Sequence, residues 1–372
     1  MCGPGAVRGV ARAPTTASAS LGGSRGSVKT IDTDTFDPDD YDEVIDVRSP
    51  SEFAEDHVPG AVNLPVLDDA QRVEVGTRYK QVSAFEARRL GAGYVSENIG
   101  RHLATYLADK PRDYAPLVYC WRGGQRSQSM AHVLERVGWS VGILAQGYKT
   151  FRRTVRDELE TLPGRVRYHV LAGYTGTGKT KILHALAARG EQVLDLEGLA
   201  NHQGSLLGEP PEGQNVSQKW FESQLWDALR RFDPEQPVWT EAESAKIGEV
   251  SCPKHVLHGV RGGTTFEIVA ERAERARFLS SGYRWWRDNP DVLMAKLRRL
   301  VSRYGHEEID TWQGLADARD WAGFVDRVLE MHYDPAYARS RSKNYAAPSA
   351  TVRVDGLLEG GADEAAAALL KL

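Results

Sequence analysis

Two glycine-rich loops suited to anions lie about fifty residues apart and limit what this chain can fold into. The first reads Cys120-Trp-Arg-Gly-Gly-Gln-Arg126-Ser127, and the second reads Gly173-Tyr-Thr-Gly-Thr-Gly178-Lys179-Thr180. Each loop follows an apolar strand-like run and precedes a helix-like run, an order typical of a parallel sheet. The chain is therefore predicted to be an α/β protein with one such loop in each of two domains.

Composition and motif positions predict five segments along the 372 residues. A start rich in Gly, Ala, Ser and Arg predicts a disordered tail. Alternating strands and helices then predict two α/β domains, joined by a charged helix, and the second domain becomes helical and rich in Arg and Trp. The predicted segments are a tail over 1–30, a first domain over 31–150, a linker helix over 151–168, a P-loop domain with a helical C-terminal part over 169–345, and a tail over 346–372.

The three cysteines (Cys2, Cys120 and Cys252) form no CxxC pair. This spacing argues against a zinc cluster or a disulfide framework and suits a reducing cytoplasm. No apolar run approaches the roughly 20 residues of a spanning helix, so no membrane is expected. The net charge of −4 is untypical of a nucleic-acid binder, but residues 272–303 carry nine basic and only three acidic residues. That stripe is a candidate footprint for a polyanion.

Cys120 is predicted to be reactive because of its neighbours. It ends an apolar strand and precedes a helix, so backbone N–H groups and the helix dipole would stabilise an anionic sulfur. Arg122 and Arg126 add positive charge, and the two glycines between them let the backbone curl around the sulfur. The alternative is that Cys120 is a small buried apolar residue. We predict catalytic roles for Cys120, Arg122 and Arg126.

The segments VIDVRSPSEFAEDHVPGAVNLPV and VYCWRGGQRS resemble a rhodanese domain over roughly residues 40–150. The resemblance implies that Cys120 carries a transferable chalcogen. Five residues separate Cys120 from Arg126, one more than in the usual rhodanese loop, and the wider loop favours a tetrahedral oxyanion such as a phosphorylated chalcogen. Further residues match the pattern and are predicted to be structural, with Arg48 the first candidate for an exception: Asp46, Arg48, Glu52, His57 and Asn63.

The second loop has the P-loop pattern G-x4-G-K-T. Backbone N–H groups of 174–180 would cradle phosphates, Lys179 would reach the terminal phosphate, and the Thr180 hydroxyl would bind Mg²⁺. The predicted phosphate-binding residues are Gly173, Gly176, Gly178, Lys179 and Thr180.

The sequence after the P-loop lacks a plain Walker B strand, so metal binding and water activation at this loop are predicted to be weak. Its candidate carboxylates are Asp195, Glu197, Glu241 and Glu243. Asp195 and Glu241 are predicted either as Mg²⁺ or supporting residues, or as caps of the segments that follow them. The loop is thus expected to bind a diphosphate without hydrolysing ATP. No tightly bound cofactor is expected, with Mg²⁺ the one option.

The segments DLEGLANHQGSLLG (195–208), VWTEAESAKIG (238–248) and RARFLSSGY (275–283) sharpen the resemblance to the tRNA 2-selenouridine synthase family, over about residues 35–340. That resemblance implies replacement of sulfur by selenium at wobble 2-thiouridine of Lys, Glu and Gln tRNAs. It also implies S-geranylation by geranyl diphosphate, followed by selenation with selenophosphate, whose supplying enzyme is an expected partner. We expect the P-loop to take geranyl diphosphate, and Cys120 to take selenium and deliver it.

The run Arg284-Trp285-Trp286-Arg287 interleaves arginines with aromatic residues. Aromatic rings stack on unpaired bases and arginines pair with phosphates, so this run is a candidate tRNA contact. The alternative is an amphipathic helix with tryptophans in the core. At the level of function, the rivals are a rhodanese-like sulfurtransferase fused to an ATP-dependent small-molecule kinase, and a non-catalytic sensor of phosphorylated ligands.

Overall fold

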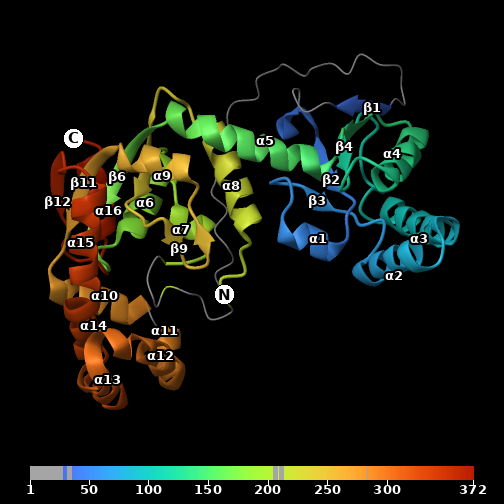
Figure 1. Cartoon of the computed structure of the whole chain (residues 1–372). Coiled ribbons are helices and arrows are strands. Elements are labelled where there is room, and N and C mark those ends of the chain that lie inside the picture. Colours follow the sequence, from blue (N-terminus) through green and yellow to red (C-terminus); the bar gives the residue numbers. More distant parts are fainter. Residues whose placement is uncertain (1–27, 32–35, 204–207, 209–212, 283) are drawn as a thin grey trace. The chain divides into compact units, whose positions relative to one another are not determined.

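The computed structural model describes residues 28–31, 36–203, 208, 213–282 and 284–372. Within these ranges the chain divides into two compact units (Figure 1). The first unit holds the described residues up to 160 together with Ser217–Asp227, and the second holds the described residues of Thr161–Val216 and Ala228–Leu372. The predicted tail over 1–30 lies outside the described residues as far as 27, but Val28–Ile31 forms a strand, so this end of the predicted tail belongs to a folded unit.

The first unit is built on a five-stranded parallel sheet with the order β1-β5-β4-β2-β3. Three of its strands, β2, β4 and β5, are almost fully buried. Their apolar side chains, such as Ile45 and Val118, pack with Met130 and Leu134 of the following helix in one core. The strands are β1 (Val28–Ile31), β2 (Glu43–Asp46), β3 (Val62–Asn63), β4 (Pro116–Tyr119) and β5 (Val141–Leu144).

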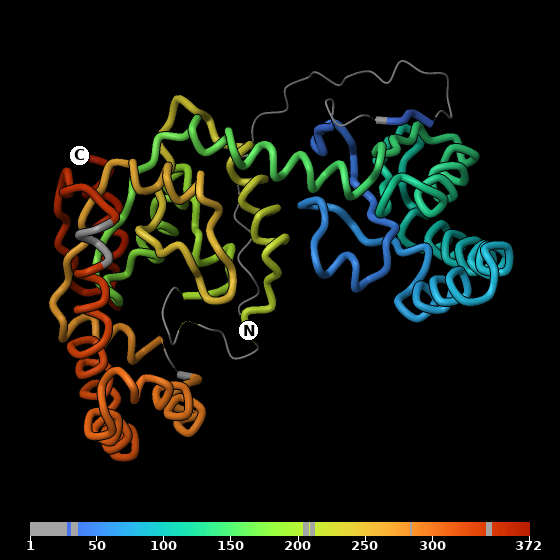
Figure 2. Tube along the Cα trace, viewed as in Figure 1, coloured from blue at the N-terminus to red at the C-terminus, as the bar shows by residue number. Residues whose placement is uncertain are grey.

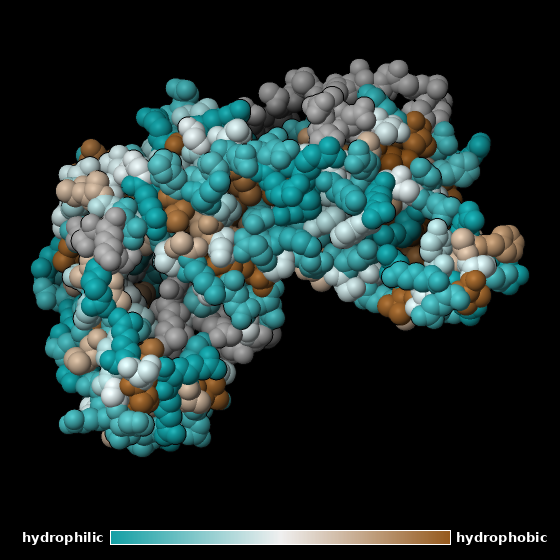
Figure 3. All heavy atoms as spheres, in the orientation of Figure 1, coloured by the Kyte–Doolittle hydropathy of each residue, from teal (hydrophilic) through white to brown (hydrophobic). Residues whose placement is uncertain are grey.

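Helices and a short 3-10 turn, Pro38–Asp40, connect these strands. The longest of these helices is α3, which runs for 21 residues from Ala84 to Ala104. Brown and tan atoms interrupt the teal surface of the α2–α3 hairpin (Figure 3), where Val73, Tyr79, Val82 and Phe85 are exposed. The helices are α1 (Pro50–Glu55), α2 (Asp69–Gln81), α3 (Ala84–Ala104), α4 (Gln125–Val137) and α5 (Tyr148–Thr161).

The second unit has its own five-stranded parallel sheet, with the order β12-β11-β6-β8-β7. In place of the whole predicted linker over 151–168, α5 ends at Thr161 and a 3-10 turn, Leu162–Arg165, leads into the central strand. The strands are β6 (Arg167–Ala172), β7 (Gln192–Leu194), β8 (Pro237–Glu241), β11 (Thr264–Val269) and β12 (Ala350–Arg353), with β9 (Lys246–Ile247) and β10 (Val250–Ser251) as a small antiparallel pair.

Residues 346–372 were predicted to be a tail, and the structure corrects this. β12 pairs with β11, and α16 (Gly361–Leu369) packs against α6 (Lys179–Ala187), the helix that follows the P-loop. The reason is apolar patterning: Ala362, Ala365, Ala366 and Leu369 share one buried helix face. Figure 2 shows this red end of the chain beside the orange stretch that contains β11. The last residues therefore complete the P-loop domain.

The remaining helices of the second unit lie around the sheet or form a helical region after β11. That region has its own core, which includes Trp286, Leu293, Trp312 and Phe324. The helices are α7 (Leu196–Leu199), α8 (Gln218–Arg231, divided between the units), α9 (Lys254–Arg261), α10 (Arg272–Gly282), α11 (Arg284–Asp288), α12 (Pro290–Leu297), α13 (Val301–Asp317), α14 (Trp321–Val328), a π-helical turn (Leu329–Tyr333), α15 (Asp334–Asn344) and a 3-10 turn (Arg298–Leu300). The predicted helical C-terminal part is confirmed.

Candidate functional sites

Cys120 lies where β4 ends and the turn into α4 begins, and its side chain is buried. Its Sγ atom is 3.2 Å from Oγ of Ser127, in the first turn of α4, and 3.9 Å from the carbonyl oxygen of Gly124, which caps that helix. The sulfur thus sits at the N-terminus of a 13-residue helix, where the helix dipole stabilises negative charge. The predicted placement is confirmed, and catalysis by Cys120 stays a prediction.

Gly147, which follows β5, closes the cysteine loop from the other side. Its φ is +55°, and a Cβ atom there would come 2.0 Å from the carbonyl oxygen of Cys120. The N–H of Tyr148 donates to that same carbonyl at 2.8 Å, and the Tyr148 ring stacks on Trp121 with centroids 5.0 Å apart. The position of Cys120 therefore depends on a glycine at 147.

The two arginines of the cysteine loop have different surroundings. Arg126 places Nη1 2.6 Å from Oε2 of Glu52, which also accepts a hydrogen bond from the N–H of Ser49 at the start of α1. Burial raises the pKa of Glu52, but the hydrogen bond and charge of Arg126, the N–H of Ser49 and the charge of Arg72 together hold that pKa below its ordinary value. Arg122 is exposed and forms no ion pair within the described ranges. The guanidinium of Arg122 is thus available to bind an anion, whereas that of Arg126 is already paired with Glu52.

Arg48 is the first candidate for an exception to the structural role predicted for its group, and its surroundings are structural. Its side chain is 1% exposed. Nη2 and Nε donate to Oδ2 of Asp46 at 2.7 and 3.0 Å, and Nε also donates to Oδ1 at 3.1 Å. Nη2 also donates to the carbonyl oxygen of Asp56 at 2.6 Å, and the guanidinium lies 4.1 Å from the ring centroid of Tyr148. Arg48 braces the interior beside Cys120 and has no free face for a ligand.

His57 and Asn63 have structural surroundings, as predicted for them. The His57 ring stacks between Phe53 and Trp220, with centroids 3.7 Å and 4.0 Å away. Burial lowers the pKa of His57, which favours the neutral ring. The Asn63 amide donates to two carbonyl oxygens at the end of β2, at 3.0 and 2.9 Å. These residues shape the turn after α1.

The P-loop connects β6 to α6, as predicted. Nζ of Lys179 donates to the carbonyl oxygen of Gly173 at 2.9 Å, so the ammonium folds back over its own loop. The N–H of Gly173 donates to the hydroxyl of Tyr337, on α15, at 2.5 Å. The Thr180 hydroxyl donates to Oε2 of Glu197 at 3.1 Å. Backbone donors, one ammonium and one hydroxyl thus meet at one helix N-terminus, the arrangement that phosphate groups require.

Three glutamates gather beside this loop: Glu197, Glu241 and Glu243. Glu241 ends β8, is 1% exposed, and accepts a hydrogen bond from the N–H of Glu197 at 2.8 Å; its Oε2 has no partner among the described residues. Burial raises the pKa of Glu241 well above its ordinary value, and the charges of nearby carboxylates raise it further. Burial also raises the pKa of Glu197 and of Glu243. The cluster therefore favours a bound proton or cation.

Asp195 lies near this cluster, and its charge adds to the effect of burial in raising the pKa of Glu241 and Glu197. It caps α7 by accepting a hydrogen bond from the N–H of Gly198 at 2.8 Å, and its other oxygen lies 3.0 Å from Nε2 of His184. That hydrogen bond raises the pKa of His184. Of the two roles predicted for Asp195, the structure shows the cap, and Glu197 takes the place beside Thr180.

No group of three or more His, Cys, Asp or Glu side chains in the described ranges is arranged to hold a metal ion by itself. Mg²⁺ at phosphate sites usually needs only one or two carboxylates with substrate phosphates and water. The orphaned Oε2 of Glu241 and the Thr180 hydroxyl fit that smaller donor set.

The predicted tRNA contact over 284–287 needs a correction at Trp286. Its side chain is 7% exposed and belongs to the core of the helical region, with Trp285 packed edge-on against it at 4.6 Å. A base therefore has no free face of Trp286 on which to stack. Arg287 lies at the rim of a pocket, and the side chain of Arg284 lies outside the described set.

The basic stripe over 272–303 is less available for binding a polyanion than its composition suggests. Arg272 pairs with Asp326 at 2.9 Å and with Glu330 at 3.2 Å. Arg275 is buried and pairs with Asp334 at 2.7 Å. These acidic partners come from later helices, so counting charge within one window could not reveal them. The first part of the stripe stabilises the fold.

The two parallel sheets, one carrying a cysteine loop and one a P-loop, define a class of enzyme that joins chalcogen chemistry to the binding of a phosphorylated ligand. Comparison with protein families agrees: residues 33–154 match the rhodanese-like domain, and residues 166–285 match the tRNA 2-selenouridine synthase AAA domain.

Two proteins named tRNA 2-selenouridine synthase illustrate the relationship. One from Nitrosomonas europaea is 36% identical over 322 residues, which cover 81% of this chain and 82% of that protein. Another from Chromohalobacter salexigens is 38% identical over 320 residues, which cover 79% of this chain and 86% of that protein. The chain belongs to the tRNA 2-selenouridine synthase family. Among the described residues no helix is long and apolar enough to cross a membrane.

Proposed function

We propose that this chain converts wobble 2-thiouridine of tRNA to 2-selenouridine through S-geranyl-2-thiouridine, with geranyl diphosphate and selenophosphate as donors. The observation that carries the proposal is the presence, in one chain, of a sulfur at a helix N-terminus and a complete P-loop. The relatives' name supplies tRNA as the substrate. By resemblance, the tRNAs are those for Lys, Glu and Gln.

In the first step, the sulfur of thiouridine attacks C1 of the geranyl group. A carbon–sulfur bond forms, the carbon–oxygen bond breaks, diphosphate leaves with the electron pair, and N3 of the base releases its proton. Lys179 and the backbone N–H groups of the P-loop would stabilise that leaving charge. Mg²⁺, held by Thr180 and Glu241, would neutralise diphosphate charge. The product carries a thioether-type sulfur, which is a better leaving group than the original sulfur.

In the second step, Cys120 would release selenide from selenophosphate. The thiolate attacks phosphorus, a sulfur–phosphorus bond forms, and the phosphorus–selenium bond breaks with its electron pair on selenium. Selenide then attacks C2 of the base, and geranyl thiolate leaves and takes a proton. Water finally hydrolyses the cysteine phosphothioester. Arg122 and Arg126 would hold the phosphoryl oxygens, as the wider loop favours.

This route replaces the expected delivery of selenium from a selenylated Cys120. Selenium in selenophosphate is already at the selenide level, so a sulfur–selenium bond on Cys120 would require an oxidant. Attack at phosphorus needs none. It also gives the five-residue spacing between Cys120 and Arg126 a purpose, because a phosphoryl group is larger than a single sulfur atom.

The proposal is tested by omitting donors from a reaction with 2-thiouridine tRNA and analysing nucleosides by mass spectrometry. Geranyl diphosphate alone should yield S-geranyl-2-thiouridine, and both donors together should yield 2-selenouridine. Selenophosphate alone should leave the thiouridine unchanged. Turnover of ATP with a small molecule, without any change to the tRNA, would support the sulfurtransferase–kinase rival instead.

A further inference from the structure

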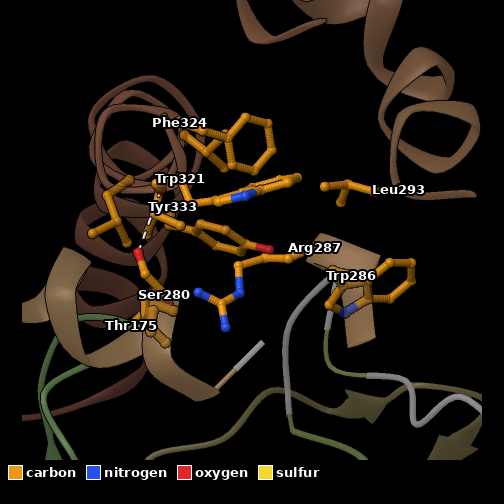
Figure 4. Close-up of a pocket in the computed structure, with 12 residues that line it drawn as sticks. Thr175, Ser280, Trp286, Arg287, Leu293, Trp321, Phe324 and Tyr333 are labelled. Carbon is orange, nitrogen blue, oxygen red and sulfur yellow. Dashed lines mark hydrogen bonds between the residues drawn. The ribbon is translucent and has the colours of Figure 1, made fainter. Parts of the chain in front are cut away.

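An apolar pocket lies beside the P-loop in the second unit (Figure 4). Its enclosed volume is about 30 Å³, and the rest of the hollow is open to solvent. Four aromatic residues and several aliphatic ones form its walls, drawn from α10, α11, α12, α14 and the π-helical turn. The lining residues are Thr175, Leu279, Ser280, Trp286, Arg287, Leu293, Trp321, Phe324, Val325, Val328, Leu329 and Tyr333.

The pocket borders the P-loop. Thr175 belongs to both, and a Cβ atom added at the neighbouring Gly176 would come 2.8 Å from Cδ1 of Leu279 in the pocket wall. Nη1 of Arg275 donates to the carbonyl oxygen of Thr175 at 3.0 Å, while Asp334 holds the guanidinium at 2.7 and 2.9 Å. The loop and the wall are thus tied together. A ligand with its phosphates in the loop can extend directly into the pocket.

The lining disfavours a nucleoside as that extension. A buried base leaves its donors and acceptors unpaired unless the wall supplies partners. The Ser280 hydroxyl is already used, since it donates to the carbonyl oxygen of Ala276 at 2.6 Å. Figure 4 shows the guanidinium of Arg287 directed toward Thr175 and Ser280, on the side of the pocket nearest the loop. One cation at the loop side and apolar walls beyond it suit a ligand with an anionic head and a hydrocarbon tail.

We propose that this pocket binds the hydrocarbon tail of a prenyl diphosphate whose head group occupies the P-loop. The inference rests on the proposed function. It adds which part of the protein selects the donor: the apolar walls from α10 and α14 select an isoprenoid over a nucleotide. Arg287 sits where the head joins the tail and contributes positive charge to the diphosphate. Trp286 then serves as pocket wall, in place of the predicted tRNA contact.

The test fills the pocket and measures binding by calorimetry. Val325→Phe, on the partly buried wall of α14, should weaken geranyl diphosphate binding by about tenfold, since excess bulk excludes part of the tail. Binding of inorganic diphosphate should change less than about twofold, because the head-group site is untouched. Val292→Phe makes the same change at an exposed position of α12 and should affect neither ligand.

A shorter ligand shows whether misfolding of Val325→Phe explains a loss of geranyl diphosphate binding. Dimethylallyl diphosphate should bind wild type and Val325→Phe alike, because its tail does not need the filled space. If Val325→Phe binds geranyl diphosphate as tightly as wild type, the tail lies elsewhere and the inference is wrong, even if geranyl transfer proceeds. If wild type binds inorganic diphosphate as well as geranyl diphosphate, the pocket takes no tail. Failure of the proposed function would show differently, as bound geranyl diphosphate that never reaches tRNA.

Discussion

Glu241 brings a buried carboxylate to within reach of the P-loop, and its neighbours make its ionisation costly. The chain sets Glu197, Glu243 and Glu241 together. Burial raises the pKa of Glu197 and of Glu243, and the charge of Lys179 offsets only part of that rise. The sequence named both Asp195 and Glu241, and left each open between a Mg²⁺ or supporting role and a cap. The missing information is long-range. Glu241 ends β8 and Glu197 lies in the first turn of α7, and only the folded chain shows that Glu197 is the carboxylate beside Thr180.

Glu241→Gln tests this ionisation through the pH dependence of stability. The pKa of Glu241 is raised above its ordinary value of 4.5, so the folded state binds the proton more tightly than the unfolded chain. The stability from this group is fully present below pH 4.5 and is lost as pH rises through the raised pKa. Without Mg²⁺, the variant should unfold at a higher temperature than wild type at pH 8, because glutamine removes the buried ionisable group.

The same comparison should show almost no difference near pH 4.5, and Mg²⁺ should stabilise wild type more than the variant. Glu235→Gln, at an exposed position, is the matched control and should follow wild type at every pH. A Glu241→Gln protein that is less stable than wild type at pH 8 would show that the carboxylate is ionised and favourably bound in the fold.

At the scale of elements, the sequence predicted both phosphate-type loops because each lies between a strand and a helix that are adjacent in the chain. It missed β1, β11 and β12. β12 and α16 are separated from the rest of their sheet by the whole helical region, so no local pattern joins them to it. Their own patterns were readable: Val352 and Val354 alternate with exposed residues, and the alanines of α16 recur on one helix face.

Gly147→Ala tests the closing turn of the cysteine loop. A methyl group there meets the carbonyl oxygen of Cys120, and an L-residue other than glycine is strained at φ +55°. We expect selenation to fall by at least about tenfold, because small misplacements of reacting groups are costly. Geranylation should be kept. Gly138→Ala, also at positive φ but with no atom within 4 Å of the added Cβ, is the control for backbone strain alone. Equal losses in both variants would contradict the account.

Ala366→Asp tests the C-terminal helix as part of the P-loop domain. Ala366 is fully buried against the core that includes Leu183 and Leu186 of α6, so a carboxylate there would lie without a partner. The expected loss of stability is about 3 kcal/mol or more. Ala367→Asp, on the partly exposed side of the same helix, should cost far less. Equal unfolding midpoints for the two variants in denaturant would mean that α16 is not packed on α6.

At the scale of the whole molecule, two independent parallel sheets each present one anion loop, and this division matches a reaction with two anionic donors. The division could be predicted from the sequence because both loops are local motifs. The balance of charge on the helical region could not, since Arg272 and Arg275 are neutralised by residues more than fifty positions away. The proposed tRNA-binding face must therefore be sought beyond this neutralised part of the stripe.

The central claim is that the P-loop serves geranylation and the cysteine loop serves selenation, and supplying each variant with the other's intermediate tests it most directly. With 2-thiouridine tRNA and geranyl diphosphate, Cys120→Ser should form S-geranyl-2-thiouridine as wild type does, whereas Lys179→Ala should form little. With S-geranyl-2-thiouridine tRNA and selenophosphate, Lys179→Ala should form 2-selenouridine as wild type does, and Cys120→Ser should not. Nucleoside mass spectrometry reads all four reactions. Full selenation of the geranylated tRNA by Cys120→Ser, or none by Lys179→Ala, would contradict the assignment of one donor to each loop.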